Sequence, residues 1–151
     1  MILARIMLRV TVVGAALITL VAMMSLTAPD SRAQEGKLEL ISFTIDPPYA
    51  SPGGMARIRF EFRGAAGGLV SAQLLARPAS GTWRRSLFED AVNRAITALG
   101  PLERGTVEAI AQHAARYAPE QRGTSNEYEL RLVDRTGRKS NALTVSLPVR
   151  M

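Results

Sequence analysis

The segment YELRLVDRTGRKSN, residues 128–141, decides the fold class of this chain. Apolar and charged residues alternate from Tyr128 to Leu132, which predicts a strand with one face buried and the other in water. Asp134–Gly137 predicts a turn, because Asp accepts hydrogen bonds from the backbone amides ahead of it and Gly tolerates a left-handed conformation. A second alternating run follows over residues 143–149. The segment therefore predicts an antiparallel hairpin.

Three upstream segments show the same period of two. They extend over residues 37–45, 56–63 and 69–76, and stretches rich in Pro and Gly separate them. The middle one is the most regular, because its apolar residues alternate strictly with Arg and Glu. Such alternation is typical of antiparallel sheets with one wet face. We expect Phe60 in this segment and Leu132 in the hairpin to lie in one core between two sheets.

Residues 86–99 follow helical spacing instead. Ser86 and Glu89 form the pattern of a capping box, in which each side chain bonds the backbone of the other, and Gly100–Pro101 is a strong stop signal. The apolar positions of this stretch are Leu87, Phe88, Ala91, Val92, Ala95, Ile96 and Leu99. The spacing predicts a short helix.

The next stretch is ambiguous. Residues 106–117 have apolar positions that suit a second helix, whereas residues 105–112 also suit a strand. A sandwich built from only five strands would have one thin sheet, so we predict a strand over residues 105–112. The fold class expected from the sequence is all-β: a two-sheet antiparallel sandwich with a short helical insertion at about residues 86–99.

The order of these motifs resembles that of bacterial immunoglobulin-like domains, a broad group of exported β-sandwiches. Their sixth strand often reads Tyr-x-Leu-x-Val-x-Asp-x-x-Gly-x-x-Ser-Asn. The resemblance covers most of residues 38–149 and is weakest over residues 82–121. The matching positions are Tyr128, Leu130, Asp134, Gly137, Ser140 and Asn141, with Leu132 in place of Val.

The resemblance implies structural roles rather than an activity. Tyr128 would be the tyrosine-corner residue, whose hydroxyl bonds to backbone upstream. Asp134 and Gly137 would form the turn of the last hairpin. Because sandwiches of this kind carry many unrelated functions, the family implies a fold and no defined reaction.

The beginning of the chain predicts export. Arg5 and Arg9 accompany a short basic start, and an uncharged run of about 17 residues follows over residues 10–26. Ser31 and Ala33 then place small side chains where signal peptidase requires them. These features indicate a secretory signal peptide.

We therefore expect a signal peptide over residues 1–33, cleavage before Gln34, and a single immunoglobulin-like domain over residues 34–151. An uncleaved anchor helix is the alternative, because the apolar run is near the lower limit for spanning a bilayer. The chain contains no Cys, which suits a bacterial periplasm or cell surface better than a disulfide-rich secreted module. The expected location is periplasmic or secreted.

The sequence offers little for catalysis. His113 is the only histidine and there is no cysteine, so a zinc site would need several carboxylates. No Gly-x-Ser-x-Gly elbow accompanies the histidine. Glu89 and Asp90 are adjacent, so on a helix they diverge by about 100°. We expect no enzymatic activity, no cofactor and no metal.

The charge pattern argues against nucleic-acid binding. The chain has 19 Lys and Arg against 13 Asp and Glu, for a net charge of +6. The basic residues are scattered along the sequence and few aromatic residues accompany them, whereas nucleic-acid binding requires a basic face with stacking side chains. Attraction to an anionic membrane or wall polymer has little support in this pattern, and we expect no stable membrane insertion after cleavage.

The function expected from the sequence is that of an exported, non-enzymatic binding or structural module of the bacterial cell envelope. It would contact a protein or polysaccharide through loops or an edge strand. The alternative is an inhibitor or accessory subunit of an exported enzyme that uses residues 82–104. A helix with its apolar face exposed would favour this alternative, whereas a helix folded onto the sandwich would be scaffold.

Trp83, Arg84 and Arg85 are the candidate partner contacts within that segment. Trp83 is the only tryptophan, and it does not lie on the third strand, where immunoglobulin domains bury theirs. It is either a satellite core residue or an exposed contact at the edge of the insertion.

Overall fold

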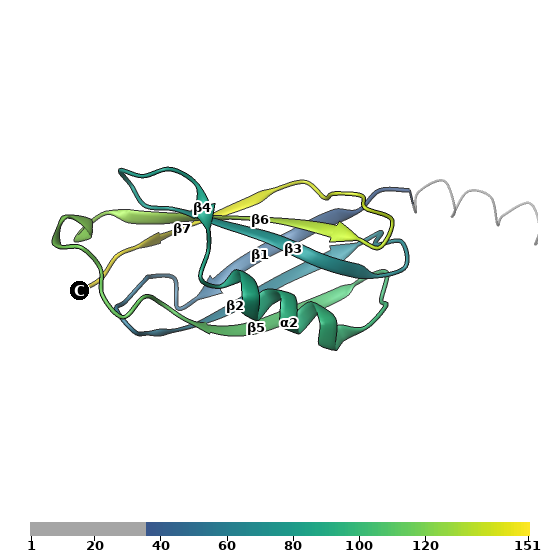
Figure 1. The fold of residues 1–151 in the computed structure, drawn as a ribbon, viewed down its shortest axis with the longest axis horizontal. Helices are drawn as coiled ribbons and strands as arrows, with labels where there is room; N and C mark the ends of the chain where they lie inside the picture. Colours follow the sequence, from purple (N-terminus) through teal and green to yellow (C-terminus); the bar gives the residue numbers. More distant parts are fainter. Residues whose placement is uncertain (1–35) are drawn as a thin grey trace, which may run out of the picture. The chain divides into compact units, whose positions relative to one another are not determined.

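The computed structural model describes residues 36–151 (Figure 1). The predicted signal peptide, residues 1–33, lies outside the described residues. In the part that is described, no helix is long and apolar enough to cross a membrane. The elements are β1 (Glu39–Asp46), β2 (Met55–Arg63), β3 (Leu69–Arg77), β4 (Arg84–Arg85), α2 (Glu89–Leu99), β5 (Gly105–Gln112), the 3-10 turn η1 (Pro119–Gln121), β6 (Ser125–Asp134) and β7 (Leu143–Pro148).

The strands form two antiparallel sheets that pack face to face. One sheet has the order β1-β2-β5 and the other has the order β4-β3-β6-β7. Every pair of neighbouring strands is antiparallel. This is the two-sheet sandwich with a short helix that the alternating segments predict, and the fold class is confirmed.

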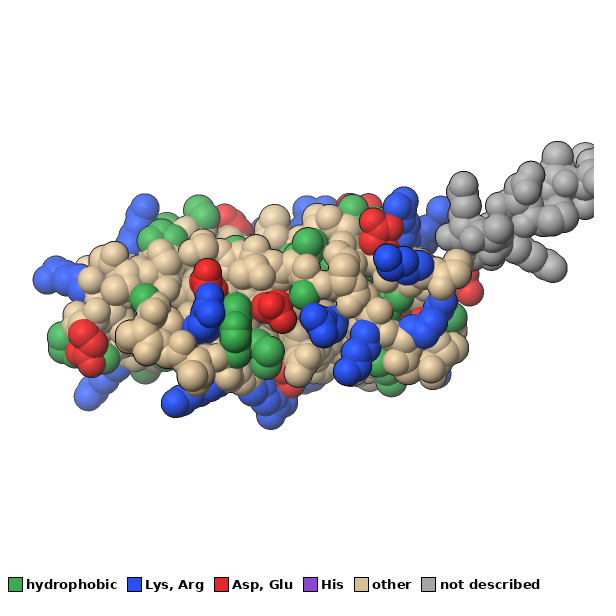
Figure 2. Space-filling model, turned by 90° about the horizontal axis from the view of Figure 1, so that it is seen from above, with side chains coloured by type: hydrophobic (Ala, Val, Ile, Leu, Met, Phe, Trp, Pro, Cys, Tyr) green, Lys and Arg blue, Asp and Glu red, His purple; other side chains and the backbone are tan. Residues whose placement is uncertain are grey.

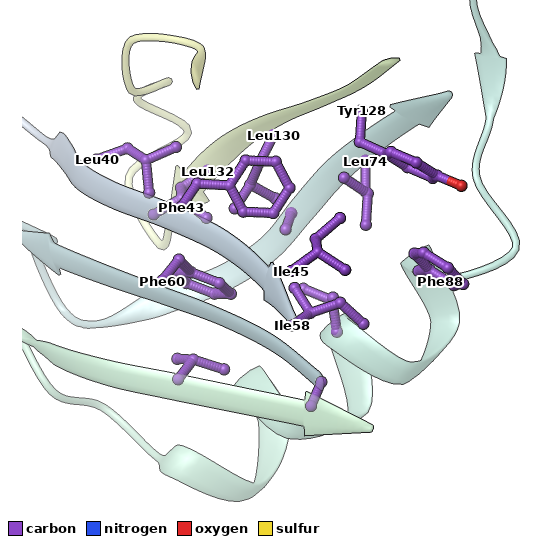
Figure 3. Close-up of a cluster of buried hydrophobic side chains, with 14 of the residues drawn as sticks. Leu40, Phe43, Ile45, Ile58, Phe60, Leu74, Phe88, Tyr128, Leu130 and Leu132 are labelled. Carbon is purple, nitrogen blue, oxygen red and sulfur yellow. The ribbon is translucent and has the colours of Figure 1, made fainter. Parts of the chain in front are cut away.

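The core lies between the two sheets (Figure 3). Phe60 on β2 and Leu132 on β6 both lie in it with no exposed surface. Strand β2 alternates buried and exposed residues along its whole length, so every second side chain of this strand contributes to the core. Among the described residues, Phe60, Phe62, Phe88, Leu38, Leu40 and Ile58 are the largest of the fully buried side chains.

The ambiguous stretch after the helix is a strand. β5 spans Gly105–Gln112 and pairs with β2 along its full length, so the strand prediction is confirmed. It completes the three-stranded sheet, as the topological argument requires. β4 is not predicted from the sequence, because two residues are too few to show a period.

The helical insertion is confirmed, but its start differs from the prediction. Phe88 is the N-cap and no side chain caps the helix. The Ser86 hydroxyl accepts the Phe88 N–H at 3.1 Å, while the Glu89 carboxylate accepts the Leu74 N–H of β3 at 3.0 Å. The predicted capping box is wrong, because the edge of β3 uses the carboxylate that the box would need.

Two asparagines cover strand edges. Asn93 of α2 accepts the Ala72 N–H at 2.8 Å and donates to the Ala72 carbonyl oxygen at 3.1 Å. Asn141 accepts the Leu40 N–H at 2.8 Å and donates to the Leu40 carbonyl oxygen at 3.0 Å. Each amide takes the place of a neighbouring strand at one residue, so these edge groups are not free to pair with another chain. We call Asn93 and Asn141 the edge caps.

Helix α2 is an integral part of the sandwich. It runs along the side of the domain between β3 and β5, and it contacts both strands (Figure 1). Phe88, Val92 and Ile96 are buried in the common core. The apolar face of the insertion is therefore covered by the chain's own sheets, which is the arrangement expected of scaffold.

Candidate functional site

The only tryptophan of the sequence, Trp83, lies directly before β4, the edge strand of the four-stranded sheet. Strand register places Arg84 opposite Ala76 and Arg85 opposite Leu75, so Trp83 comes next to Arg77. The Arg77 guanidinium lies over the Trp83 ring at 4.7 Å from its centre. The sequence left open whether Trp83 is core or exposed, and the structure shows a half-buried ring at the sheet edge.

Polar side chains continue across the sheet from Trp83. Arg77 is paired in register with Glu127 and forms an ion pair with it. Glu127 in turn lies opposite Ser146 of β7. Within this ion pair, 42% of the Arg77 side chain and 36% of the Glu127 side chain are exposed. Both groups are therefore accessible to a ligand. We call Trp83, Arg77, Glu127 and Ser146 the Trp83 surface.

Figure 2 shows the domain from above. Near the middle of this view, hydrophobic side chains lie between basic and acidic ones. Basic side chains also gather toward the right-hand end, with acidic ones among them.

The two arginines that follow Trp83 differ in their surroundings. Arg85 bonds the Glu89 carboxylate at 2.7 Å and also pairs with Asp90. These carboxylates raise the pKa of Arg85 above its ordinary value, the hydrogen bond to Glu89 being the main cause. Arg84 is exposed and has no ion pair within residues 36–151. Of the two, Arg84 is the one free to meet a partner.

A shallow hollow lies on the solvent side of α2. It has a volume of about 480 Å³ and is lined by Asp90, Asn93, Arg94, Thr97 and Ala98. The Asn93 amide in this lining is already hydrogen-bonded to the backbone of Ala72, because Asn93 caps the edge of β3. The remaining lining is one carboxylate, one guanidinium and small side chains, which gives no nucleophile with an adjacent base.

A buried aromatic cluster occupies the end of the sandwich near η1. The Tyr128 ring stacks on Phe88, with centres 5.2 Å apart, and Phe88 meets His113 edge-on at 5.0 Å. The Tyr117 hydroxyl is 3.1 Å from His113 Nδ1. Within residues 36–151, His113 Nε2 is buried and has no hydrogen-bond partner. Burial lowers the pKa of His113, because a charged ring would lose its hydration.

Tyr128 differs from a tyrosine corner in one respect. Its ring enters the core and is 5% exposed, but no backbone group in residues 36–151 bonds its hydroxyl. The hydroxyl points away from the centre of the core (Figure 3), and the Asn126 side chain lies beside it. Burial raises the pKa of Tyr128. Stacking on Phe88, a residue of the insertion, fixes the ring in this direction.

Asp134 holds the turn at the opposite end of the sandwich. Its side chain is fully buried. One oxygen accepts the Thr136 N–H at 2.9 Å, the Thr136 hydroxyl at 2.6 Å and the Arg138 N–H at 3.1 Å. The other oxygen accepts the Ala66 N–H at 3.2 Å and Arg138 Nε at 2.9 Å. Gly137 completes the turn with a φ of +83°, which other residues rarely adopt.

These donors determine the ionisation of Asp134. Burial alone would raise the pKa of this carboxyl, but hydrogen bonds from Thr136 and Arg138 outweigh burial and bring it down to about 2. Asp134 is therefore charged at neutral pH and has every oxygen engaged. Its role is to hold the β6–β7 turn against the loop after β2.

The titratable residues considered for catalysis serve structure here. Glu89 binds β3 and Arg85, and Asp90 pairs with Arg85. His113 is buried against the Phe88 ring. In residues 36–151 no group of three or more His, Asp or Glu side chains could hold a metal ion. The surface best suited to meet a partner is the Trp83 surface, with Arg84 at its edge.

The sequence proposed Trp83, Arg84 and Arg85 as candidate contacts but gave no indication of Arg77 or of the aromatic cluster. In the sequence, Arg77 marks only the end of a strand. Its contact with Trp83 depends on the pairing of β3 with β4. The pairing of Phe88 with His113 and Tyr128 joins three segments far apart in the chain. The one feature of the sequence that indicated this surface was Trp83, as the only tryptophan.

Comparison with known proteins establishes the fold. No protein-family model and no curated protein matches this chain. Among solved structures, a Niemann-Pick type C2 protein from the Japanese carpenter ant is similar, with a TM-score of 0.50 and 9% identity over 76% of this chain and 93% of that one.

Two other structures are more distant. A SrpA adhesin variant from Streptococcus sanguinis has a TM-score of 0.43 and 16% identity over 76% of this chain and 58% of the adhesin. A type II cohesin domain from the cellulosome of Acetivibrio cellulolyticus has a TM-score of 0.32 and 9% identity over 74% of this chain and 95% of the cohesin. The likeness to the Niemann-Pick type C2 protein, at 9% identity, shows the β-sandwich fold alone.

Proposed function

We propose that this chain is an exported, non-enzymatic binding module of the bacterial cell envelope, and that a protein or polysaccharide partner contacts the Trp83 surface. The observation that carries the proposal is the position of Trp83. The ring is half-buried at the edge of an open sheet face, beside an arginine and a glutamate that remain partly exposed. Trp and Arg are the residue types most enriched at the centres of interfaces.

The chemistry of the surface suits a polar partner. The Trp83 ring offers a flat apolar contact, while Arg77 donates and Glu127 accepts hydrogen bonds beside it. Ser146 adds a hydroxyl in the same row. A sugar with alternating hydroxyl groups and C–H faces, or a polar protein loop, would find both kinds of contact here.

The alternative role, an inhibitor or accessory subunit that binds through the insertion, is less well supported. An exposed apolar helix face would favour this role, but Phe88, Val92 and Ile96 are buried against the sheets. Leu87 is the exception and is 72% exposed. A single exposed leucine is normal for a soluble surface. The part of the insertion left for a partner is the segment at Trp83 and Arg84.

Because Trp83 is the only tryptophan, its fluorescence reports on the proposed surface directly. The test is to titrate the domain with purified envelope polysaccharide and, in parallel, with fractionated envelope proteins. We expect the Trp83 emission of the wild type to change on binding. We expect Trp83→Ala, whose binding is measured by sedimentation, to lose that binding. Ile110→Ala is the matched control, since Ile110 is 58% exposed on the other sheet. Equal binding by both variants would rule out this surface.

Export is a separate part of the proposal and has its own measurement. We expect the mature protein to begin at Gln34, because Ser31 and Ala33 are the small pair placed after the apolar run. Mass spectrometry of the exported product determines its first residue. A full-length chain kept in the membrane fraction would instead indicate an anchored domain.

A further inference from the structure

Basic residues that are scattered in the sequence come together at one end of the sandwich. The loop after β2 lies at the centre of this end. Gly64 approaches the Lys37 carbonyl so closely that a Cβ would be 2.1 Å from its oxygen. Ala65 donates its N–H to the Glu103 carbonyl at 2.9 Å, and Gly68 accepts the Arg135 N–H at 3.1 Å. We call this region, made of residues 37, 64–68, 101–104 and 135–139, the basic end.

Four cations of the basic end are exposed and have no ion pair among the described residues: Lys37, Arg104, Arg135 and Lys139. The acidic residues of this region do little to offset them. Asp134 is buried and forms an ion pair with Arg138, so Glu103 is the exposed acidic residue among these loop residues.

One apolar side chain accompanies these cations. Leu102 lies in the same loop as Arg104 and is 47% exposed. The loops of the basic end contain no aromatic residue, so the stacking surface that a sugar or a nucleic acid would use is missing there. Basic side chains around an exposed leucine are typical of surfaces that lie on anionic membranes.

The direction of the chain favours the same partner. Residues 1–36 join the sandwich at Lys37, which belongs to the basic end. If cleavage occurs before Gln34, the new α-amino group adds a positive charge three residues from Lys37. This charge would strengthen the attraction of the basic end to an anionic membrane.

We propose that the basic end binds peripherally to membranes that carry anionic phospholipids. The headgroup phosphates would meet Lys37, Arg104, Arg135 and Lys139, and the Leu102 side chain would enter the boundary between headgroups and acyl chains. Each basic residue near such a surface raises the partition coefficient about fivefold. The Trp83 surface belongs to a different part of the domain, so this binding is independent of the proposed partner.

The test measures co-sedimentation of residues 34–151 with vesicles. This part contains every strand and the whole core described above, and a cooperative thermal transition verifies that each variant folds. The wild type is expected to bind phosphatidylcholine vesicles that contain phosphatidylglycerol, to be released by salt, and not to bind phosphatidylcholine alone. Absence of binding to the anionic vesicles, or equal binding to both kinds, would overturn the proposal.

Two matched triple variants locate the site. The variant Arg104→Glu, Arg135→Glu and Lys139→Glu is expected to lower the partition coefficient more than about 100-fold, as three lost cations require. The control variant, with the same change in net charge, replaces Arg84, Arg116 and Arg122 by Glu away from the basic end. We expect it to stay within about fivefold of the wild type. Equal losses in both variants would show that net charge alone acts.

Two further measurements separate the remaining explanations. Leu102→Ser is expected to weaken the binding about tenfold, because burial of one leucine side chain is lost. Binding to a soluble anionic polysaccharide without binding to vesicles would assign the basic end to a polymer and overturn the membrane proposal. Trp83→Ala is expected to bind vesicles like the wild type, so failure of one proposal does not imply failure of the other.

Discussion

The two ends of the sandwich bury polar groups in opposite ways. At the basic end, Asp134 is buried as an anion that accepts five hydrogen bonds. At the other end, His113 is buried as a ring whose Nδ1 contacts the Tyr117 hydroxyl, and its Nε2 has no hydrogen-bond partner among residues 36–151. A tight turn offers many backbone donors to a carboxylate, whereas strand ends packed with aromatic rings offer few. The first end is thus fixed by charge and hydrogen bonds, and the second by packing.

Phe60→Ala sets the scale for this comparison, since both ends depend on the same core. Phe60 has no exposed surface, and truncating a buried phenylalanine leaves a cavity. We expect a loss of about 4 kcal/mol in unfolding free energy. Denaturant titration measures it. A loss below about 1 kcal/mol would mean that the register of β2 is wrong.

Asp134→Ala tests the charged end. It removes the acceptor for Ala66, Thr136 and Arg138, so several partly buried hydrogen bonds are lost at once. We expect a loss of about 3 kcal/mol, near the lower end for a broken buried pair, because Arg138 can still reach water. Asp134→Asn, which keeps one acceptor oxygen, should lose less. Equal losses for the two variants would show that the charge of Asp134 contributes nothing.

Acid titration separates the two ends by pH window. The Asp134 pKa falls from 3.8 to about 2 on folding, so its stabilisation is complete above pH 3.8 and is lost as the pH falls toward 2. Across this pH range the unfolding free energy falls by about 2 kcal/mol. The His113 pKa lies below its ordinary 6.5, so stability also falls as the pH drops below 6.5. Asp134→Asn should flatten only the acid window, and His113→Gln only the upper one, in unfolding free energies measured from pH 8 to 2.

Tyr128→Phe is the smallest change and tests the aromatic end. The ring keeps its stack on Phe88 and loses only the hydroxyl beside Asn126. We expect a loss of about 1 kcal/mol and a fall of several degrees in melting temperature, with no change in partner binding. An unchanged melting temperature would show that the hydroxyl contributes nothing to stability.

Regular features of the fold were predictable from the sequence, because the period of two reports which side chains face the core. The five alternating segments appear where their patterns place them, and the helix predicted over residues 86–99 is present but begins at Glu89. Strand β5 required the added argument that a sandwich needs two full sheets. In contrast, β4 and the true start of α2 depend on contacts with β3, and no local pattern records those.

The surfaces were harder to predict for the same reason. The cations of the basic end lie as far apart in the sequence as Lys37 and Lys139, and only the meeting of three loops brings them together. Trp83 stood out as a unique residue, but its partner Arg77 is defined by the register of β3 and β4. Charge counted along a sequence does not show where charge gathers in space.

The edge caps also bear on the order in which the sandwich can form. Asn93 and Ala72 are 21 residues apart, whereas Asn141 and Leu40 are 101 residues apart. Closing the longer loop costs more chain entropy, and a chain made from its N-terminus exposes β1 long before residue 141 exists. The edge of β3 can therefore be covered during synthesis, while β1 must wait for the last hairpin. A chain truncated before Asn141 would keep an open edge on β1, available for pairing with other unfinished chains.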